Sequence, residues 1–396
     1  MKADYTRWKH SMSRTSYLPN NQYSLKIIED LQEFEQLRDV WDNLAEKHDS
    51  YFPFLCFDWF RIWLKNFLNR EQLFVLLLYY EGTIVAIAPF LIKTVRFQGL
   101  SVKAIDLIGN IYSPFRYFLF HTQDKGEMEH HLSLIVSFLR SNRRDWDITM
   151  LNGIPEENSC FEVVRGAIKK TAMRHREFPC YGNWYLDGIE YTADQYFMNL
   201  PNKVRKDILY CKRRLQNMGN LSFKLITDRE SIDYYMNLYY EIYSRSWQKK
   251  EGIGPNFHRD LAHIASEKNW LRLGFLMFND CPISSQFWIS SNGTAFILKT
   301  IYDQNYKKYS LGKVLTMEMI RHIITVDNVR VIDYIHGDEP YKQNWTPKRR
   351  ERKGLYLYNN DLKGRYLAFL NNQVLPIARK NKYLKRTKET IVNYLK

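Results

Sequence analysis

The chain has 396 residues, 45% of them hydrophobic and 26% charged, a length that suits two domains and a composition that excludes wholesale disorder. Its five cysteines are scattered without a Cys-x-x-Cys pair, which excludes a zinc ribbon and indicates reduced thiols in a cytoplasmic protein. The formal net charge of +15 is concentrated in residues 203–214 and 340–396, where Lys and Arg outnumber Asp and Glu by 6 to 1 and by 15 to 3. Such an excess points to a polyanionic partner such as coenzyme phosphates, a pyrophosphate-linked sugar, nucleic acid or an anionic membrane. The alternative is a solvated helix face followed by a solubilising tail.

The first half combines amphipathic helices with strand-like segments. Residues 1–23 are polar and basic and lack the apolar core of a signal peptide, so we expect a mobile lead-in. Residues 73–92 are long enough to span a bilayer, but Glu81-Gly82-Thr83 in their middle favours a buried hairpin. Helices are predicted over residues 24–44, 57–67, 128–139 and 161–172, and strands over residues 102–108 and 146–151.

The second half repeats this order of elements. Helices are predicted over 202–218, 232–246, 259–267 and 312–326, a hairpin over 271–290, and strands over 294–302 and 329–335. Gly82 aligns with Asp280 at an offset of 198 residues, which indicates a duplicated unit. We therefore predict two mixed α/β halves packed side by side, over residues 24–190 and 191–358, with a basic helical tail over 359–396 and a ligand cleft between or within the halves.

The segment richest in chemical signals joins the strand at 294–302 to the helix that begins at Gly312. The first-turn amides of a helix lack partners and its dipole favours an anion, so this junction can hold phosphate. The alternative is an ordinary helix start with solvated lysines.

This junction resembles the pyrophosphate loop of GNAT N-acetyltransferases, Arg/Gln-x-x-Gly-x-Gly/Ala. Lys307 stands at the first marked position, Ser310 at the first glycine and Gly312 at the last. The resemblance implies acetyl-CoA or another acyl-CoA as co-substrate. The residues that it places on the coenzyme are Lys307, Lys308, Ser310, Leu311, Gly312 and Lys313.

Over residues 25–350 the chain is similar to the CelD-like acetyltransferases, duplicated-GNAT relatives of the Fem-type peptidyl transferases. The shared patterns include Trp41-Asp42-x-Leu44, Trp146-Asp147, Lys203-x-Arg205 and Asp333-Tyr334-x-x-Gly337-Asp338-x-x-Tyr341-Lys342-x-x-Trp345. The similarity implies an α/β (mixed α+β) fold of two tandem GNAT-like halves, each a mixed, mostly antiparallel sheet flanked by helices. It also implies a cytoplasmic N-acyltransferase for an amine of a sugar or precursor in bacterial envelope or exopolysaccharide synthesis.

The segment after the strand at 329–335 carries acid, hydroxyl and amine groups. An amine of pKa about 10.4 must lose a proton before acylation, at a cost of about 4.6 kcal/mol at pH 7. We expect Asp338 to act as base or amine-orienting group, Tyr341 as acid and Lys342 as charge partner. The alternatives are a helix cap for Asp338, packing for Tyr341 and a structural ion pair for Lys342.

Four further residues are candidates for substrate binding: Tyr112, Arg116, Asp303 and Trp345. Tyr112 and Arg116 occupy the first-half position that corresponds to the phosphate loop. This position has no glycine-rich helix start, so we expect the first half to be degenerate and to form the acceptor wall. Each of the four has a purely structural alternative, such as packing for Trp345. No histidine pair has companion ligands at metal spacing, so no metal is expected.

Two other functions remain open. One is an aminoacyl-tRNA-dependent transferase of the Fem type, which would use the same fold and the basic excess. The other is a non-catalytic protein that binds a polyanion or a membrane surface through its tail, where aromatic residues alternate with Lys and Arg. The expected partners are an amine acceptor and, transiently, an anionic membrane at its cytoplasmic face, in preference to nucleic acid.

Overall fold

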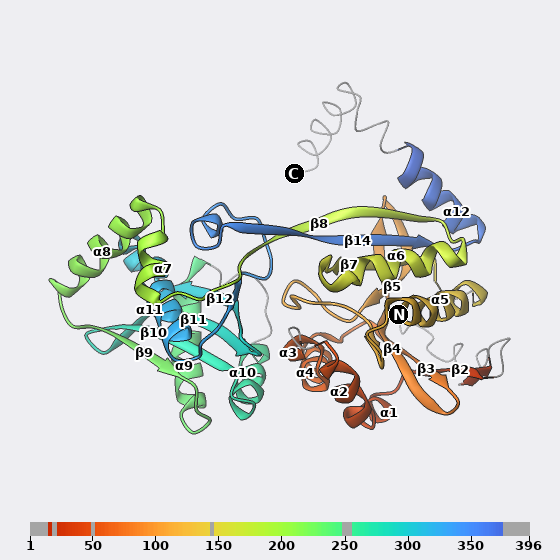
Figure 1. The fold of residues 1–396 in the computed structure, drawn as a ribbon, viewed down its shortest axis with the longest axis horizontal. Helices are drawn as coiled ribbons and strands as arrows, with labels where there is room; N and C mark the ends of the chain where they lie inside the picture. The colour runs from red at the N-terminus through yellow and green to blue at the C-terminus, as the bar shows by residue number, and fades with distance from the viewer. Residues whose placement is uncertain (1–14, 18–21, 49–51, 143–145, 248–255, 375–396) are drawn as a thin grey trace, which may run out of the picture.

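A computed structural model describes residues 15–17, 22–48, 52–142, 146–247 and 256–374. The strands form one mixed sheet of 14 strands in the order β1-β2-β3-β4-β5-β7-β14-β8-β13-β12-β11-β10-β9, with β6 paired to β4. Helices cover the sheet in two lobes, which two long strands connect (Figure 1). The predicted mixed α/β class is confirmed, and the two halves share a single continuous sheet. No helix among the described residues is long and apolar enough to cross a membrane.

The first half supplies one side of this sheet. Its elements are β1 (Thr15–Tyr17), β2 (Tyr23–Ile28), α1 (Leu31–Glu35), α2 (Arg38–Glu46), α3 (Phe52–Leu55), α4 (Phe57–Phe67), β3 (Gln72–Tyr80), β4 (Thr83–Phe97), β5 (Leu100–Leu107), β6 (Leu119–Phe120), α5 (Lys125–Ser141), β7 (Ile148–Ile154), the short 3₁₀ helix η3 (Glu157–Ser159), α6 (Cys160–Thr171) and β8 (His175–Leu186).

The second half supplies the other side. Its elements are α7 (Ala193–Asn199), α8 (Asn202–Gln216), β9 (Leu221–Ile226), α9 (Ile232–Arg245), α10 (Phe257–Glu267), β10 (Leu271–Phe278), β11 (Cys281–Ser291), β12 (Thr294–Tyr302), η5 (Gln304–Tyr309), α11 (Leu311–Thr325), β13 (Val331–Asp333), η6 (Lys342–Asn344), β14 (Lys348–Tyr358), α12 (Leu362–Phe369) and the single π-turn η7 (Leu370–Val374).

The two predicted hairpins, β3–β4 and β10–β11, are confirmed and share their local geometry. Glu81 and Gly82 both have positive φ, as do Asn279 and Asp280, which is the geometry of a type I′ turn. Each hairpin also shifts register just before its turn, between Leu78 and Tyr79 and between Leu276 and Met277, at the same 198-residue offset. Because an irregularity of this kind requires no particular residue, its recurrence supports duplication of one structural unit.

The helix predicted over residues 24–44 is wrong at its start. Tyr23–Ile28 forms β2 and pairs with β3, and helix begins only at Leu31, after Asp30 accepts two backbone amides as N-cap. The predicted lead-in over residues 1–23 lies mostly outside the described residues, although Thr15–Tyr17 pairs with β2.

The long strands β8 and β14 each extend from their own half into the part of the sheet that belongs to the other half. β14, which comes last in the sheet-forming chain, lies between β7 and β8 and so completes the first-half sheet. β8, which ends the first half, reaches β13 through Tyr185 and Leu186. The division at residues 190 and 191 stays a prediction, and this exchange is a feature that it did not include.

A buried polar network holds the exchanged strands together. The Asn183 amide donates to Asp333 at 2.7 Å, and Arg350 donates to the same carboxylate. Arg352, only 2% exposed, donates to Asn183 at 3.0 Å and pairs with Glu157 at 2.5 Å. These side chains come from β8, β13, β14 and η3, and removal of a charged member would leave its buried partner incompletely compensated.

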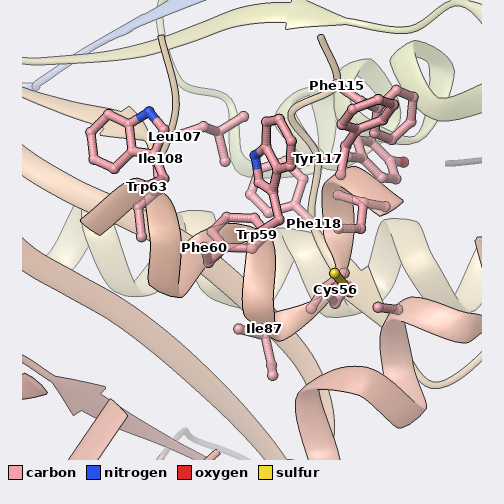
Figure 2. Packing of buried hydrophobic residues seen from close by; sticks show 14 of the residues in the cluster. Cys56, Trp59, Phe60, Trp63, Ile87, Leu107, Ile108, Phe115, Tyr117 and Phe118 are labelled. Carbon is pink, nitrogen blue, oxygen red and sulfur yellow. The ribbon is translucent and has the colours of Figure 1, made fainter. Parts of the chain in front are cut away.

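The hydrophobic core continues from one half into the other. Trp59 and Phe60 of α4 lie in a dense group of buried aromatic side chains, which Phe115, Tyr117 and Phe118 join (Figure 2). These last three residues anchor the loop that follows β5. On the second-half side of α4, the rings of Trp59 and Phe257 lie 6.0 Å apart.

Candidate active site

A pocket of about 670 Å³ opens where β12 and β13 separate. The two strands pair in parallel only through Thr294–Phe296, and the following residues of β12 line the pocket. Leu298 is an extra residue in β12, because Phe287 pairs with Lys299 while Trp288 pairs with Ile297. Such a bulge bends a strand and frees backbone groups. The wall is completed by the start of α11, by residues between Tyr334 and Trp345, and by the first-half loop after β5. We call this space the interhalf pocket.

One end of the interhalf pocket is the start of α11. Ser310 adopts a left-handed conformation with φ of 46°, and its side chain makes no capping bond to the helix within the described residues. Leu311 and Gly312 line the pocket directly after it. A β-carbon at Gly312 would meet only the Thr300 methyl, at 3.6 Å, so packing within the protein does not require glycine there. The helix start is therefore open toward the pocket, as an anion site requires.

The predicted basic residues of this end divide into two groups. Lys307 and Lys313 line the pocket, and the Lys313 ammonium also pairs with Asp207 of α8 at 2.5 Å. Lys308 lies outside the lining, with its ammonium 5.2 Å from the Tyr309 ring centroid. Asp303 also lies outside the lining and is buried.

Asp303 holds the turn that precedes α11. Its carboxylate accepts the Asn305 amide at 2.9 Å and pairs with Arg245 at 3.0 Å. These contacts assign Asp303 to the loop's structure and leave it no contact with the pocket.

Another part of the interhalf pocket wall is a strained turn at the end of β13. Ile335 has φ of 50°, a conformation that is unusual for a β-branched residue. Its amide donates to Asp333 at 2.5 Å, and the His336 amide donates to the Tyr334 carbonyl at 2.7 Å. The turn brings Ile335 and His336 into the pocket wall. Strain of this kind persists where surrounding contacts over-determine the backbone, and it is frequent at functional sites.

His336 is a pocket residue that the sequence analysis did not select. Its ring lies 4.0 Å from the Tyr181 ring, centroid to centroid. Burial, reinforced by the nearby Lys342 ammonium, lowers the pKa of His336 below 6.5. The imidazole is therefore neutral at pH 7 and can accept a proton. Its position immediately after a strand and before Gly337-Asp338 was the available signal.

Three side chains with hydroxyl or amine groups lie close together in this part of the pocket wall. Tyr334 is buried, its hydroxyl has no hydrogen-bond partner among the described residues, and burial raises its pKa well above 10. Tyr341 lines the pocket half-exposed, and removal from water together with the Glu339 charge raises its pKa to about 12. Lys342 is buried, pairs with Glu339 at 2.8 Å and donates to the His336 carbonyl. Both tyrosines thus stay protonated at neutral pH.

Asp338 does not line the interhalf pocket. Arg349 of β14 donates two bonds to its carboxylate, at 2.7 and 2.9 Å, and the Gly182 amide donates a third at 3.0 Å. The bond from Arg349 is the main cause that lowers the pKa of Asp338. A carboxylate held in this way is a weak base and a good structural anchor between β8 and β14.

The remaining predicted residues lie as follows. Tyr112 lines the pocket from the first half, with its ring stacked at 5.9 Å on Phe67. Arg116, on the same loop, lies outside the lining and packs against Gly109, where a β-carbon would be 2.9 Å from its Cδ. Trp345 is buried in the pocket wall, and its carbonyl accepts the Tyr196 hydroxyl at 2.8 Å.

Two kinds of comparison with known proteins bear on the fold. Residues 202–343 match the family model described as an acetyltransferase (GNAT) domain, so the expected acetyltransferase domain is confirmed there. FemX is similar in structure at 10% identity and a TM-score of 0.50, over 79% of this chain and 94% of FemX, which extends the shared fold to both halves. A conserved protein of unknown function from Bacteroides thetaiotaomicron VPI-5482 is 13% identical over 84% of this chain and 99% of its own, with a TM-score of 0.48. A tandem GNAT protein from the clavulanic acid biosynthesis pathway is 12% identical over 86% and 99%, with a TM-score of 0.45. No curated protein matches the chain.

Proposed function

We propose that the protein is an acyl-CoA-dependent N-acyltransferase that modifies an amine of a sugar or sugar precursor in bacterial envelope or exopolysaccharide synthesis. The observation that carries the proposal is the slot between β12 and β13, which ends at the open start of α11. The match of residues 202–343 to an acetyltransferase domain supports the same reaction class.

The residues at the start of α11 fit the phosphates of a coenzyme. The amides of Leu311 and Gly312 begin a helix whose dipole favours negative charge, and Lys307 and Lys313 add positive charge beside them. The pocket offers about 670 Å³ beyond this point, which is within the usual range for a ligand site. When bound there, an acyl-CoA thioester would supply the activated acyl group.

Proton transfer falls to the pocket residues that follow β13. His336 is neutral at pH 7, so it can accept the proton that the acceptor ammonium must lose before attack. Tyr341 also lines the pocket and stays protonated, so it can donate to the departing thiolate. Lys342 is held by Glu339 and by two backbone carbonyls, and it orients the turn that carries His336. We assign the base to His336 in place of Asp338, because Arg349 occupies the Asp338 carboxylate.

The rim of the pocket suits a sugar that carries an amine. Trp247 and Tyr341 line the pocket with 58% and 50% of their surfaces exposed, and Tyr112 lines it from the first half. Exposed aromatic faces can cover the apolar face of a sugar ring while polar groups take its hydroxyls. Glu339 also lines the pocket, where its carboxylate pairs with the Lys342 ammonium at 2.8 Å.

Two measurements test the proposal. Acetyl-CoA should raise the melting temperature of the full chain in proportion to the logarithm of its concentration, because binding only to the folded state stabilises it. A thiol-release assay with free and nucleotide-linked amino sugars should then show amine-dependent turnover. Absence of any thermal shift at millimolar acetyl-CoA would exclude the coenzyme. Turnover from aminoacyl-tRNA alone would instead identify a Fem-type reaction.

A further inference from the structure

His336, the base of the proposed reaction, rests against a side chain from the first half. Tyr181 lies on β8, one of the two long strands that connect the lobes (Figure 1). Its ring and the His336 imidazole are 4.0 Å apart between centroids, with 42° between their planes. His336 lines the interhalf pocket and Tyr181 does not. The phenol ring therefore covers part of the imidazole without forming part of the pocket wall.

An irregularity in β8 places Tyr181 at this point. Tyr181 pairs with Arg352 of β14, while Pro179 pairs with the next residue of that strand, Lys353. Cys180 is therefore an extra residue in β8. Bulges of this kind change the direction of neighbouring side chains and are frequent beside active sites.

The residue after Tyr181 binds the turn that carries His336. The Gly337 amide donates to the Gly182 carbonyl at 3.0 Å, and the Gly182 amide donates to the Asp338 carboxylate at 3.0 Å. The turn cannot move away from Tyr181 without losing these two hydrogen bonds. The imidazole and the phenol ring are thus held together by the backbone as well as by their own contact.

Gly153 of β7 provides the space that the Tyr181 ring occupies. Gly153 has φ of 74°, and a β-carbon there would lie 2.7 Å from the Tyr181 hydroxyl oxygen. Both the backbone conformation and the close approach favour glycine. The Gly153 amide also donates to the Cys180 Sγ at 3.4 Å. Strand β7 therefore supports both the bulge and the ring that follows it.

We propose that Tyr181 is a positioning residue for His336, a role that rests on the proposed function. A ring fixed against the imidazole limits its rotation and keeps water from the surface that it covers. The first half would then orient the base in addition to lining the pocket through Tyr112.

Four charged groups face His336 from its own segment and from the loop after β5: Lys342, Glu339, Asp338 and Arg116. Burial is the largest cause of the lowered pKa of His336; the two cations add to this effect and the two carboxylates oppose it. The Tyr181 phenol is neutral at pH 7, because burial raises its pKa above 10. Loss of its ring should therefore act by admitting water, which raises the pKa of His336 toward 6.5.

Titration of His336 in the full chain tests this role. Its imidazole signal in an NMR spectrum is identified as the one that His336→Gln lacks. Tyr181→Leu should bring the pKa of His336 closer to 6.5 and move the acidic fall in kcat to higher pH with it. At pH 8 the variant should lose roughly tenfold in kcat with the KM for acetyl-CoA unchanged, because the base is less well oriented. Tyr181→Phe keeps the ring and should restore both the titration and kcat.

Phe178→Leu is the matched control, because it removes another ring of β8, one that stacks on Tyr356 at 4.2 Å. It should leave the titration of His336 unchanged. An equal shift in this control, an equal loss in Tyr181→Phe, or no change in Tyr181→Leu would overturn the role.

One measurement on the parent chain does not depend on the folding of any variant. Ring protons of Tyr181 and His336 should show a nuclear Overhauser contact, and its absence would overturn the role. Absence of amine-dependent turnover in the parent would overturn the proposed function, and the titration would then still decide whether Tyr181 holds the imidazole.

Discussion

Both halves contain a hairpin with a bulge and a strand that leads to a helix, yet the two helices begin differently. In the second half, α11 begins at a left-handed Ser310 without a side-chain cap, beside Lys307 and Lys313. In the first half, the Asp124 side chain caps α5 by accepting the Glu127 amide at 2.8 Å. An internal carboxylate thus occupies the place where an external anion would bind.

The first-half junction has taken another role. A loop replaces the direct entry into the helix, and buried aromatic residues such as Phe115 and Phe118 anchor it. From this loop Tyr112 lines the interhalf pocket. Under the proposed function, the second unit holds the coenzyme and the first forms a wall for the acceptor.

Introducing an internal carboxylate at the second junction should produce the largest effect. Gly312→Asp should reduce acetyl-CoA affinity by roughly a hundredfold or more, because the new charge occupies the anion site. Stability should hold or rise, since a first-turn carboxylate suits the helix dipole and the space beside Thr300 is adequate. Titration calorimetry and thermal melting measure the two quantities. Gly312→Ala is the control and should keep most of the affinity; a comparable loss there would attribute the effect to bulk.

Removal of the proposed base should lower turnover. His336→Gln should reduce kcat by roughly a hundredfold or more while acetyl-CoA affinity stays unchanged. Because the pKa of His336 lies below 6.5, parent kcat should fall on acidification through that lower pKa, and the variant should lose this step.

The same shift has a consequence for stability. A histidine whose pKa is lowered by folding takes up protons more readily when unfolded, so its contribution to stability declines as pH falls below 6.5.

Asp338→Asn is the matched control for His336→Gln, and its kcat should still fall on acidification as in the parent. Disappearance of that fall in Asp338→Asn would return the role of base to Asp338.

Truncation of Tyr112 should weaken binding of the amine without affecting the coenzyme. Tyr112→Ala should raise KM for the amine by about tenfold, because an aromatic contact to the acceptor is lost. The dissociation constant for acetyl-CoA should not change. Steady-state kinetics with varied amine and calorimetry with coenzyme distinguish the two, and an effect confined to the coenzyme would contradict the assignment of the first half to the acceptor.

The smallest effect should come from relief of backbone strain at Ser310. Ser310→Gly should raise the free energy of unfolding by about 0.5–1 kcal/mol, because glycine adopts a left-handed φ without steric cost. Denaturant unfolding measures the change, and acetyl-CoA affinity should stay equal or improve. A clear destabilisation would mean that the Ser310 side chain has a structural role.

Local patterns predicted much of the fold. The hairpins, α4, α8 and the entry into α11 follow from periodicity and turn chemistry within short windows, as do Gly312 and Lys307 in the pocket. Features set by distant residues were missed. The basic composition of residues 348–358 does not predict a strand, and β14 gains its hydrogen-bond partners only because it lies between β7 and β8. The engagement of Asp338 by Arg349 depends on that insertion too.

The exchange of β8 and β14 between the halves makes the folding of each lobe depend on the other. An isolated fragment ending near residue 190 would present the free edge of β7, and the complementary fragment would carry β14 without a neighbour to pair with. Unsatisfied edges of this length recruit other chains. Co-expression of both pieces should therefore restore solubility where either alone aggregates, and the enzyme should melt as one cooperative body.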